Sequence, residues 1–234
     1  MIKLILASML LLMQNPLNPI TWRFNSGTPP PQFESGASAF ATVTGTSNPI
    51  TVTETGGEAI AIIVQANASS STITVADSNG TTTNRTNGAW DASSRAAYIW
   101  TECNAAAGSH TITVSASTST LTFVAVQSYT GAAVSCFDVA STFANPTNSG
   151  SLINCNAITT TQGFDTVVVG AGASSTTANT SSGNGLTQRF TAGSTNKYSS
   201  FDGTVSAAGS YTPGAVIAST STPGYCTAVA FKHP

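Results

Sequence analysis

Charged side chains are scarce in this sequence of 234 residues. Asp, Glu, Lys and Arg make up 7% of the chain, whereas an ordinary soluble domain has about 25%. The 7 Lys and Arg residues form no cluster, and the net charge is −2. Because nucleic acids and anionic membrane surfaces are bound through clustered cations, the sequence predicts neither of them as a partner.

Helical periodicity and long apolar runs are also missing. No stretch carries apolar residues at helical spacing between capping residues, so we expect no helix of consequence. The apolar run at residues 4–13 is too short to span a bilayer. Hydrophobic residues nevertheless make up 41% of the chain and come in strand-sized runs. This pattern excludes a disordered low-complexity chain and favours an all-β domain.

Motifs for a cofactor or a metal are lacking as well. Gly170-Ala171-Gly172 follows an apolar run, but poor helix formers come after it, so we expect no phosphate site. The segment 77–80, Asp-Ser-Asn-Gly, begins like a calcium loop, yet Gly88 stands where a bidentate carboxylate is needed. We interpret it as a hairpin turn and keep a looser calcium site at Asp77 or Asp91 as the lesser alternative. The sequence predicts no cofactor and no metal site.

The sequence shows no recognisable arrangement of catalytic residues. None of the candidate carboxylates sits in an aromatic-rich motif of the kind that frames a sugar cleft. A serine or cysteine nucleophile would need a base, but His110 opens an expected strand and His233 is the penultimate residue. We predict no catalytic residue and no enzyme activity. The carboxylates weighed are Glu54, Glu58, Asp91, Glu102, Asp138, Asp165 and Asp202.

The four cysteines, Cys103, Cys136, Cys155 and Cys226, allow three disulfide pairings, and none lies in a C-x-x-C motif. The sequence leaves two alternatives: two disulfides in an oxidising setting, or four buried thiols. Cys136 and Cys155 flank the connection at residues 145–150, so we expect these two to pair. Cys103 and Cys226 would then pair with each other or stay free.

Several segments of the chain return about 100 residues later, in the same order. Residues 62–70, 79–80, 107–111 and 122–126 reappear as 167–175, 184–185, 208–212 and 227–231. Two copies are too few for a solenoid, so the pattern predicts one β-sandwich built from two pseudo-repeats. In that alignment Val64 superposes on Val169 and Val124 on Val229.

Strand signals come about every ten residues, bounded by Gly, Asn, Asp and Ser. The first copy gives strands near 39–45, 58–68, 72–77, 94–102, 109–116 and 120–130. The second copy gives strands near 152–160, 164–173, 186–192, 198–205, 210–218 and 225–232. We therefore divide the chain into a segment at 1–38 and a duplicated β-sandwich domain at 39–234.

Residues 1–38 begin with a lysine and a short apolar run, followed by a proline-rich stretch. The sequence leaves two alternatives for this segment, a cleaved signal peptide or a retained assembly arm, because no good cleavage site follows the run. The prolines predict an extended arm. Trp22 and Phe24 are the aromatic residues that would anchor such an arm on a neighbour.

Exposed aromatic rings would also serve as platforms for a sugar. Trp90 lies in the sequence Asn-Gly-Ala-Trp-Asp, which has a loop composition, and is the best candidate. Tyr98 and Trp100 fall on one face of an expected strand, so we predict that they belong to the core.

Four segments together resemble a known class of module: the turn at 77–80, the strand at 123–132, the segment 137–139 and the closing strand at 229–231. Over residues 40–232 the chain is similar to the jelly-roll or immunoglobulin-like β-sandwich modules of bacterial surface proteins and bacteriophage virion proteins. The resemblance implies display, adhesion or packing and supplies no catalytic residues.

These observations lead to one expected function and two alternatives. We expect a non-enzymatic structural or display subunit on the exterior of a bacteriophage virion or of a bacterial filament or coat. It would be extracellular and would assemble through its arm with copies of itself or with other subunits. The alternatives are a secreted carbohydrate-binding module with a glycan partner and a secreted hydrolase of the concanavalin-like type.

Overall fold

The computed structural model consists of β-strands, and no helix occurs among the residues that it describes. The composition predicted this all-β class, and the packed antiparallel sheets form a β-sandwich. The described residues are 29–46, 49–67, 72–86, 89–90, 95–142, 148–149, 152–173, 181–182, 185–193, 197–216 and 224–234.

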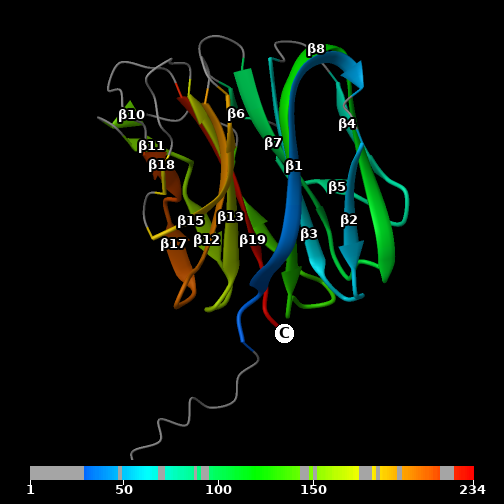
Figure 1. The fold of residues 1–234 in the computed structure, drawn as a ribbon. Coiled ribbons are helices and arrows are strands. Elements are labelled where there is room, and N and C mark those ends of the chain that lie inside the picture. Colours follow the sequence, from blue (N-terminus) through cyan, green and yellow to red (C-terminus); the bar gives the residue numbers. More distant parts are fainter. Residues whose placement is uncertain are drawn as a thin grey trace, which may run out of the picture.

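The first lobe is formed by residues 32–130, drawn in blue to green in Figure 1. Its inner sheet has the order β1-β8-β3-β7-β5, and β6 also pairs with β7. The long strand β8 serves two layers, because residues 120–129 pair with β3 while residues 108–116 pair with β2 and β4. The strands are β1 (Gln32–Thr46), β2 (Ile50–Glu54), β3 (Ala59–Asn67), β4 (Ile73–Asp77), β5 (Thr83–Asn84), β6 (Ala89–Trp90), β7 (Arg95–Glu102) and β8 (Gly108–Thr130).

The second lobe is formed by residues 137–231, drawn in green to red in Figure 1. Its inner sheet has the order β15-β16-β13-β19-β9, and two small sheets, β10-β11-β18-β14 and β12-β17, complete it. The strands are β9 (Phe137–Ala140), β10 (Asn148–Ser149), β11 (Leu152–Asn154), β12 (Ile158–Thr160), β13 (Thr166–Ala173), β14 (Ser181–Ser182), β15 (Thr187–Ala192), β16 (Lys197–Thr204), β17 (Gly209–Tyr211), β18 (Gly214–Val216) and β19 (Gly224–Phe231).

Three hydrophobic clusters hold these layers together. One fills the first lobe and contains Ile62 and Trp100, and a second fills the other lobe and contains Val169 and Phe201. The third, which we call the central core, lies between the inner sheets and joins β3, β7 and β8 to β13, β16 and β19. Both faces of β3 and β13 are therefore buried, which explains their continuous apolar sequences.

The two lobes share one pairing order: β3 lies between β7 and β8, and β13 lies between β16 and β19. This agrees with a duplicated chain, although the duplication itself stays a prediction. The expected register is wrong in one part. Val64 and Val169 do face the cores of their own lobes, but Val124 faces the first lobe's core whereas Val229 faces the central core. The short Ala/Val pattern allowed a shifted alignment, and the shift moved the side chain to the other face.

Several boundaries differ from the expected ones. Strand β1 begins at Gln32, so residues 32–38 lie in the sheet rather than in an arm. The two strands expected at 109–116 and 120–130 form the single strand β8. Residues 1–28 lie outside the part of the chain that the structure describes.

Candidate functional site

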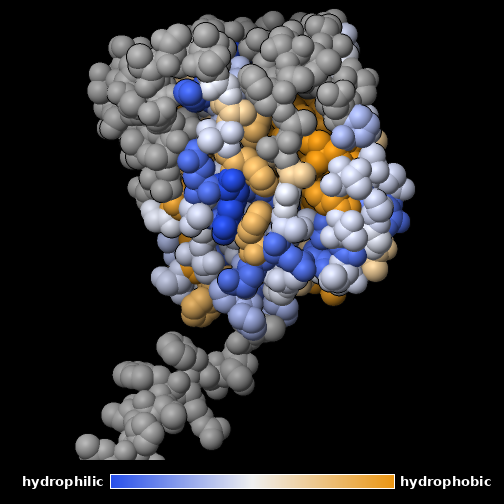
Figure 2. Space-filling model, in the orientation of Figure 1, coloured by the Kyte–Doolittle hydropathy of each residue, from blue (hydrophilic) through white to orange (hydrophobic). Residues whose placement is uncertain are grey.

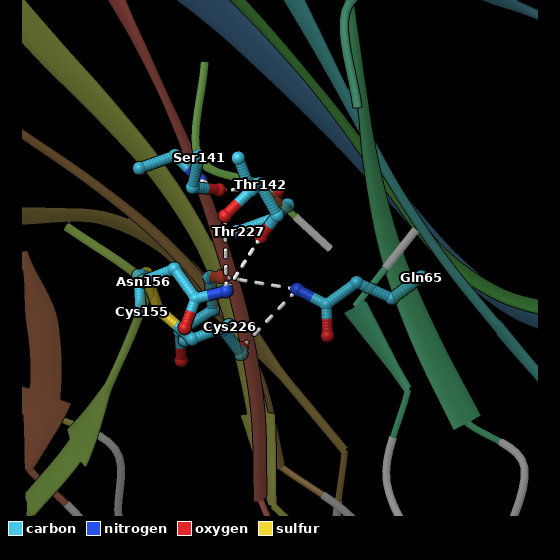
Figure 3. The surroundings of a disulfide bond; sticks show 10 residues. Gln65, Ser141, Thr142, Cys155, Asn156, Cys226 and Thr227 are labelled. Atoms are coloured by element: carbon cyan, nitrogen blue, oxygen red, sulfur yellow. Dashed lines mark hydrogen bonds between the residues drawn. A yellow bond between two sulfur atoms is a disulfide. The ribbon is translucent and has the colours of Figure 1, made fainter. Parts of the chain in front are cut away.

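The cysteines form two disulfides, Cys103–Cys136 and Cys155–Cys226, with Cα–Cα distances of 5.3 and 4.8 Å. The expected bond between Cys136 and Cys155 is therefore wrong. Closeness along the chain suggested that bond, but the packing of layers decides which cysteines meet. Cys155 follows β11, which packs on β19, where Cys226 lies (Figure 3).

The strongest cluster of chemical groups in the first lobe comprises Asp77, Glu102 and His110, which we call the acidic-histidine cluster. Asp77 ends β4, Glu102 ends β7, and His110 lies near the start of β8. Antiparallel pairing brings these strand ends together, because β4 and β2 both pair with β8 beside His110. One ligand atom from each side chain lies within 4.8 Å of the other two.

Both ring nitrogens of His110 are engaged. Nδ1 lies 2.5 Å from Oδ2 of Asp77, and Nε2 lies 2.8 Å from the carbonyl oxygen of Ala106. The side chains of His110 and Asp77 are fully buried. Burial alone would lower the pKa of His110, but the bonds to Ala106 and Asp77 outweigh it, and the pKa is raised.

Glu102 completes the acidic-histidine cluster and is 6% exposed. Its Oε2 is buried, and no described residue donates a hydrogen bond to it. Burial, and then the neighbouring Asp77, raise the pKa of Glu102 to about 7. Its carboxylate lies over Gly80, where an added Cβ would fall 2.0 Å from Oε1, so no other residue fits at position 80 without moving Glu102.

A second acidic group in the first lobe is explained by a turn. Glu58 accepts hydrogen bonds from the backbone of Thr55 at 3.0 Å and of Gly56 at 2.7 Å, and these bonds help to lower its pKa against the effect of burial. Glu54 accepts a 2.5 Å hydrogen bond from Ser128. Burial nevertheless raises the pKa of Glu54. Glu58 thus stabilises the turn at 55–58 by accepting these backbone hydrogen bonds.

The second lobe contains a pair of carboxyl groups, Asp138 and Asp165. Asp165 is fully buried, and burial and then the adjacent Asp138 raise its pKa to about 7. Asp138 accepts hydrogen bonds from the backbone and hydroxyl of Thr161 at 2.7 and 2.5 Å, and Lys232 lies 3.6 Å away. These partners lower the pKa of Asp138 even though burial opposes them. Asp165 is thus the member of the pair that takes up a proton more readily.

The second lobe also has a cavity of about 400 Å³. Gly203, which pairs with Val167 on the neighbouring strand, lies in its wall. Tyr211 ends β17 and lines this cavity. The lining residues include Val167, Leu186, Gly203, Tyr211 and Pro213.

The remaining expected site residues are placed as follows. Trp90 lies in the short strand β6 and pairs with Ala96, so it is not in a loop; its side chain lies outside the described part. Trp22, Phe24 and Asp91 also lie outside the described residues. Tyr98 and Trp100 are buried in the core, as predicted.

The sequence did not reveal the acidic-histidine cluster. Asp77, Glu102 and His110 were each considered separately, as a turn residue, a candidate carboxylate and a strand residue. Their spacings of 25 and 8 positions match no motif. Only the pairing of β4 with β8 would have shown that they meet.

No protein-family model, characterised protein or solved structure matches this chain. Within the described residues, no helix is both long and apolar enough to cross a membrane.

Proposed function

We propose that this chain is a non-enzymatic structural or display subunit on the exterior of a particle or cell, such as a bacteriophage virion or a bacterial surface filament or coat. The observation that carries the proposal is that all four cysteines are used in disulfides. Structural disulfides persist in oxidising settings and are rare in the cytosol. The cysteine use therefore supports an extracellular location.

The surface supports the same proposal. With 7% charged residues, the outside of the molecule is covered largely by Ser, Thr, Asn and backbone groups. On the face shown in Figure 2, pale and blue residues cover most of the lower half, and orange residues gather above them beside the grey atoms. Among the described residues, the exposed large hydrophobic side chains are Val134 and Phe164. A surface that is polar without charge suits packing among copies or contact with glycans.

The arrangement of the carboxyl groups supports a non-enzymatic role. A retaining glycosidase holds its two carboxyl groups about 5–5.5 Å apart, on either side of the scissile bond. Asp138 and Asp165 instead interact directly with each other, as do Asp77 and Glu102. Neither pair leaves room for a sugar between its members.

Assembly is assigned to the segment that precedes β1. The chain enters the sandwich at Pro31, whose carbonyl oxygen accepts a 2.6 Å hydrogen bond from Thr166. The C-terminus lies at the same end of the molecule (Figure 1). The preceding residues, with their apolar run and with Trp22 and Phe24, would act as the arm that contacts a neighbouring subunit.

The second candidate function is carbohydrate binding, and the cavity of the second lobe favours it. Its volume of about 400 Å³ is within the range of small-molecule sites. Tyr211 offers a ring at its wall, and Ser210 and Thr212 offer hydroxyl groups. In this role the chain would be a secreted binding module.

One comparison tests the leading proposal. The full chain and a truncation lacking residues 1–24 would be examined by light scattering for mass and by circular dichroism for melting. The proposal predicts that the full chain assembles and that the truncation is a folded monomer. A full chain that stays monomeric, or a truncation that still assembles, would contradict it. Binding of soluble oligosaccharides that is lost in Tyr211→Ala would favour the second candidate.

A further inference from the structure

Three potential metal-ligand atoms converge in the acidic-histidine cluster, at the end of the first lobe. Nε2 of His110 bonds the carbonyl oxygen of Ala106, which can only accept, so Nε2 carries the hydrogen. Nδ1 donates a hydrogen bond to Oδ2 of Asp77 in the metal-free protein, so an ion that binds there would displace this proton. A histidine that ligates a metal is fixed in this way, with its other nitrogen donating to a carbonyl or a carboxylate.

The third ligand atom is Oε2 of Glu102, which no hydrogen-bond donor among the described residues reaches. Glu102 is 6% exposed, and its Oε2 is buried. A buried carboxylate oxygen without a donor is costly, so its place beside a second carboxylate makes it a fitting ligand for a cation. Gly80 provides the space for this carboxylate, because a Cβ there would collide with both of its oxygens.

We propose that Asp77, Glu102 and His110 bind one divalent first-row transition-metal ion of the Zn²⁺ class. Two carboxylates and a neutral imidazole balance the charge of such an ion. Imidazole together with carboxylate suits Zn²⁺ and its neighbours, whereas Ca²⁺ and Mg²⁺ prefer oxygen ligands alone. The proposal reverses the sequence-based expectation of no metal site.

The geometry needs only side-chain adjustment. The three ligand atoms lie within 4.8 Å of one another, and Nδ1 and Oδ2 are 2.5 Å apart. Tetrahedral bonds of about 2.0–2.1 Å to Zn²⁺ would place the ligand atoms about 3.3 Å apart. The site lies beneath the exposed turn at residues 78–80, which gives an ion a short way in. Because the ligands come from the ends of β4, β7 and the start of β8, the ion would tie three strands together.

The test is direct binding of Zn²⁺ to the full oxidised chain, produced without a histidine tag and stripped with a chelator. Equilibrium dialysis with metal analysis and calorimetry should give one Zn²⁺ per chain, with a dissociation constant below about 10 μM. The melting temperature should rise with Zn²⁺ concentration, as expected for a ligand that binds only the folded state. Wild-type protein that shows no saturable binding of one ion below about 100 μM would overturn the proposal.

Substitutions of the proposed ligands test whether the ion binds in the acidic-histidine cluster. Glu102→Gln and His110→Gln keep side-chain size and should each weaken binding by at least about a hundredfold, since second-shell changes alone cost 10- to 100-fold. Asp165→Asn, which changes a buried carboxyl of the second lobe, is the matched control and should bind as wild type does. Equal binding by all four proteins would place the ion elsewhere and overturn the proposal. If a variant is unfolded by circular dichroism, the wild-type measurement and Gly80→Ala, which displaces the Glu102 carboxylate, decide the question.

Discussion

Gly170 lies directly against Ile63 across the central core. A Cβ added to Gly170 would fall 2.6 Å from Cγ2 of Ile63, so the inner sheets meet there with no room for one more methyl group. Gly170 belongs to the second lobe and Ile63 to the first. The contact shows that the two lobes are fitted to each other and pack as one body.

Gly170→Ala should therefore destabilise the protein by about 1–3 kcal/mol, the usual cost of overpacking a core. Urea unfolding measures the change. The double variant Gly170→Ala/Ile63→Ala should recover part of the loss, because it removes the colliding methyl group. Strict additivity of the two single changes would show that the residues do not touch.

Gln65 links the two lobes by hydrogen bonds across the central core. Its Nε2 donates hydrogen bonds to the carbonyl oxygens of Ala171 and Ser199, at 3.2 and 3.0 Å, and Figure 3 shows the side chain reaching toward the second lobe. Gln65→Met keeps the length of the side chain and removes the donor. We expect a loss of about 1–3 kcal/mol in the free energy of unfolding, measured in urea. A loss below about 0.3 kcal/mol would show that the hydrogen bonds of Gln65 do not contribute to stability.

The two disulfides should differ in their contribution to stability. They are separated by 33 and 71 residues along the chain. In the chain-entropy model, these loops correspond to about 3.7 and about 4.4 kcal/mol. We expect the paired alanine variant of Cys155 and Cys226 to be the less stable one in denaturant melts of the oxidised proteins. The reverse order would mean that effects in the folded state outweigh the loop length.

Asp165 should make stability depend on pH. Burial, and then Asp138, raise its pKa in the folded state to about 7, above the unfolded value of about 3.9. In that window the folded protein binds more protons than the unfolded one, so the free energy of unfolding falls as pH rises from about 4 to about 7. Because Asp138 has a lowered pKa, it does not titrate in this window.

Asp165→Asn should remove this contribution. The stability of the variant relative to wild type should be on the order of 1–3 kcal/mol greater at pH 8 than at pH 4, since relaxation of the folded protein around the charged pair reduces the full value. Urea melts at both pH values measure the gain. Thr161→Val, which removes one hydroxyl donor to Asp138, is a control that leaves Asp165 in place. Parallel pH profiles for wild type and Asp165→Asn would contradict the account.

The sequence was a good guide to local structure. Alternation and apolar runs predicted β3, β4, β7 and β13 within a residue or two, because a strand's own residues determine which of its faces are buried. Tyr98 and Trp100 were predicted to be core residues for the same reason.

Contacts between distant segments were harder to predict. The pairing of Cys155 with Cys226 depends on β11 packing against β19, and the acidic-histidine cluster depends on β4 pairing with β8. Neither relationship leaves a local pattern. The misplaced pair Val124 and Val229 arose because a run of Ala and Val looks alike after a shift of a few residues.

We propose that this chain works as an oxidised structural subunit outside the reducing cytosol. Mass spectrometry of the unreduced native protein, alkylated and then digested, tests it most directly. We predict no alkylated cysteine and two linked peptide pairs, Cys103 with Cys136 and Cys155 with Cys226. Four alkylated cysteines, or a peptide joining Cys136 to Cys155, would contradict it.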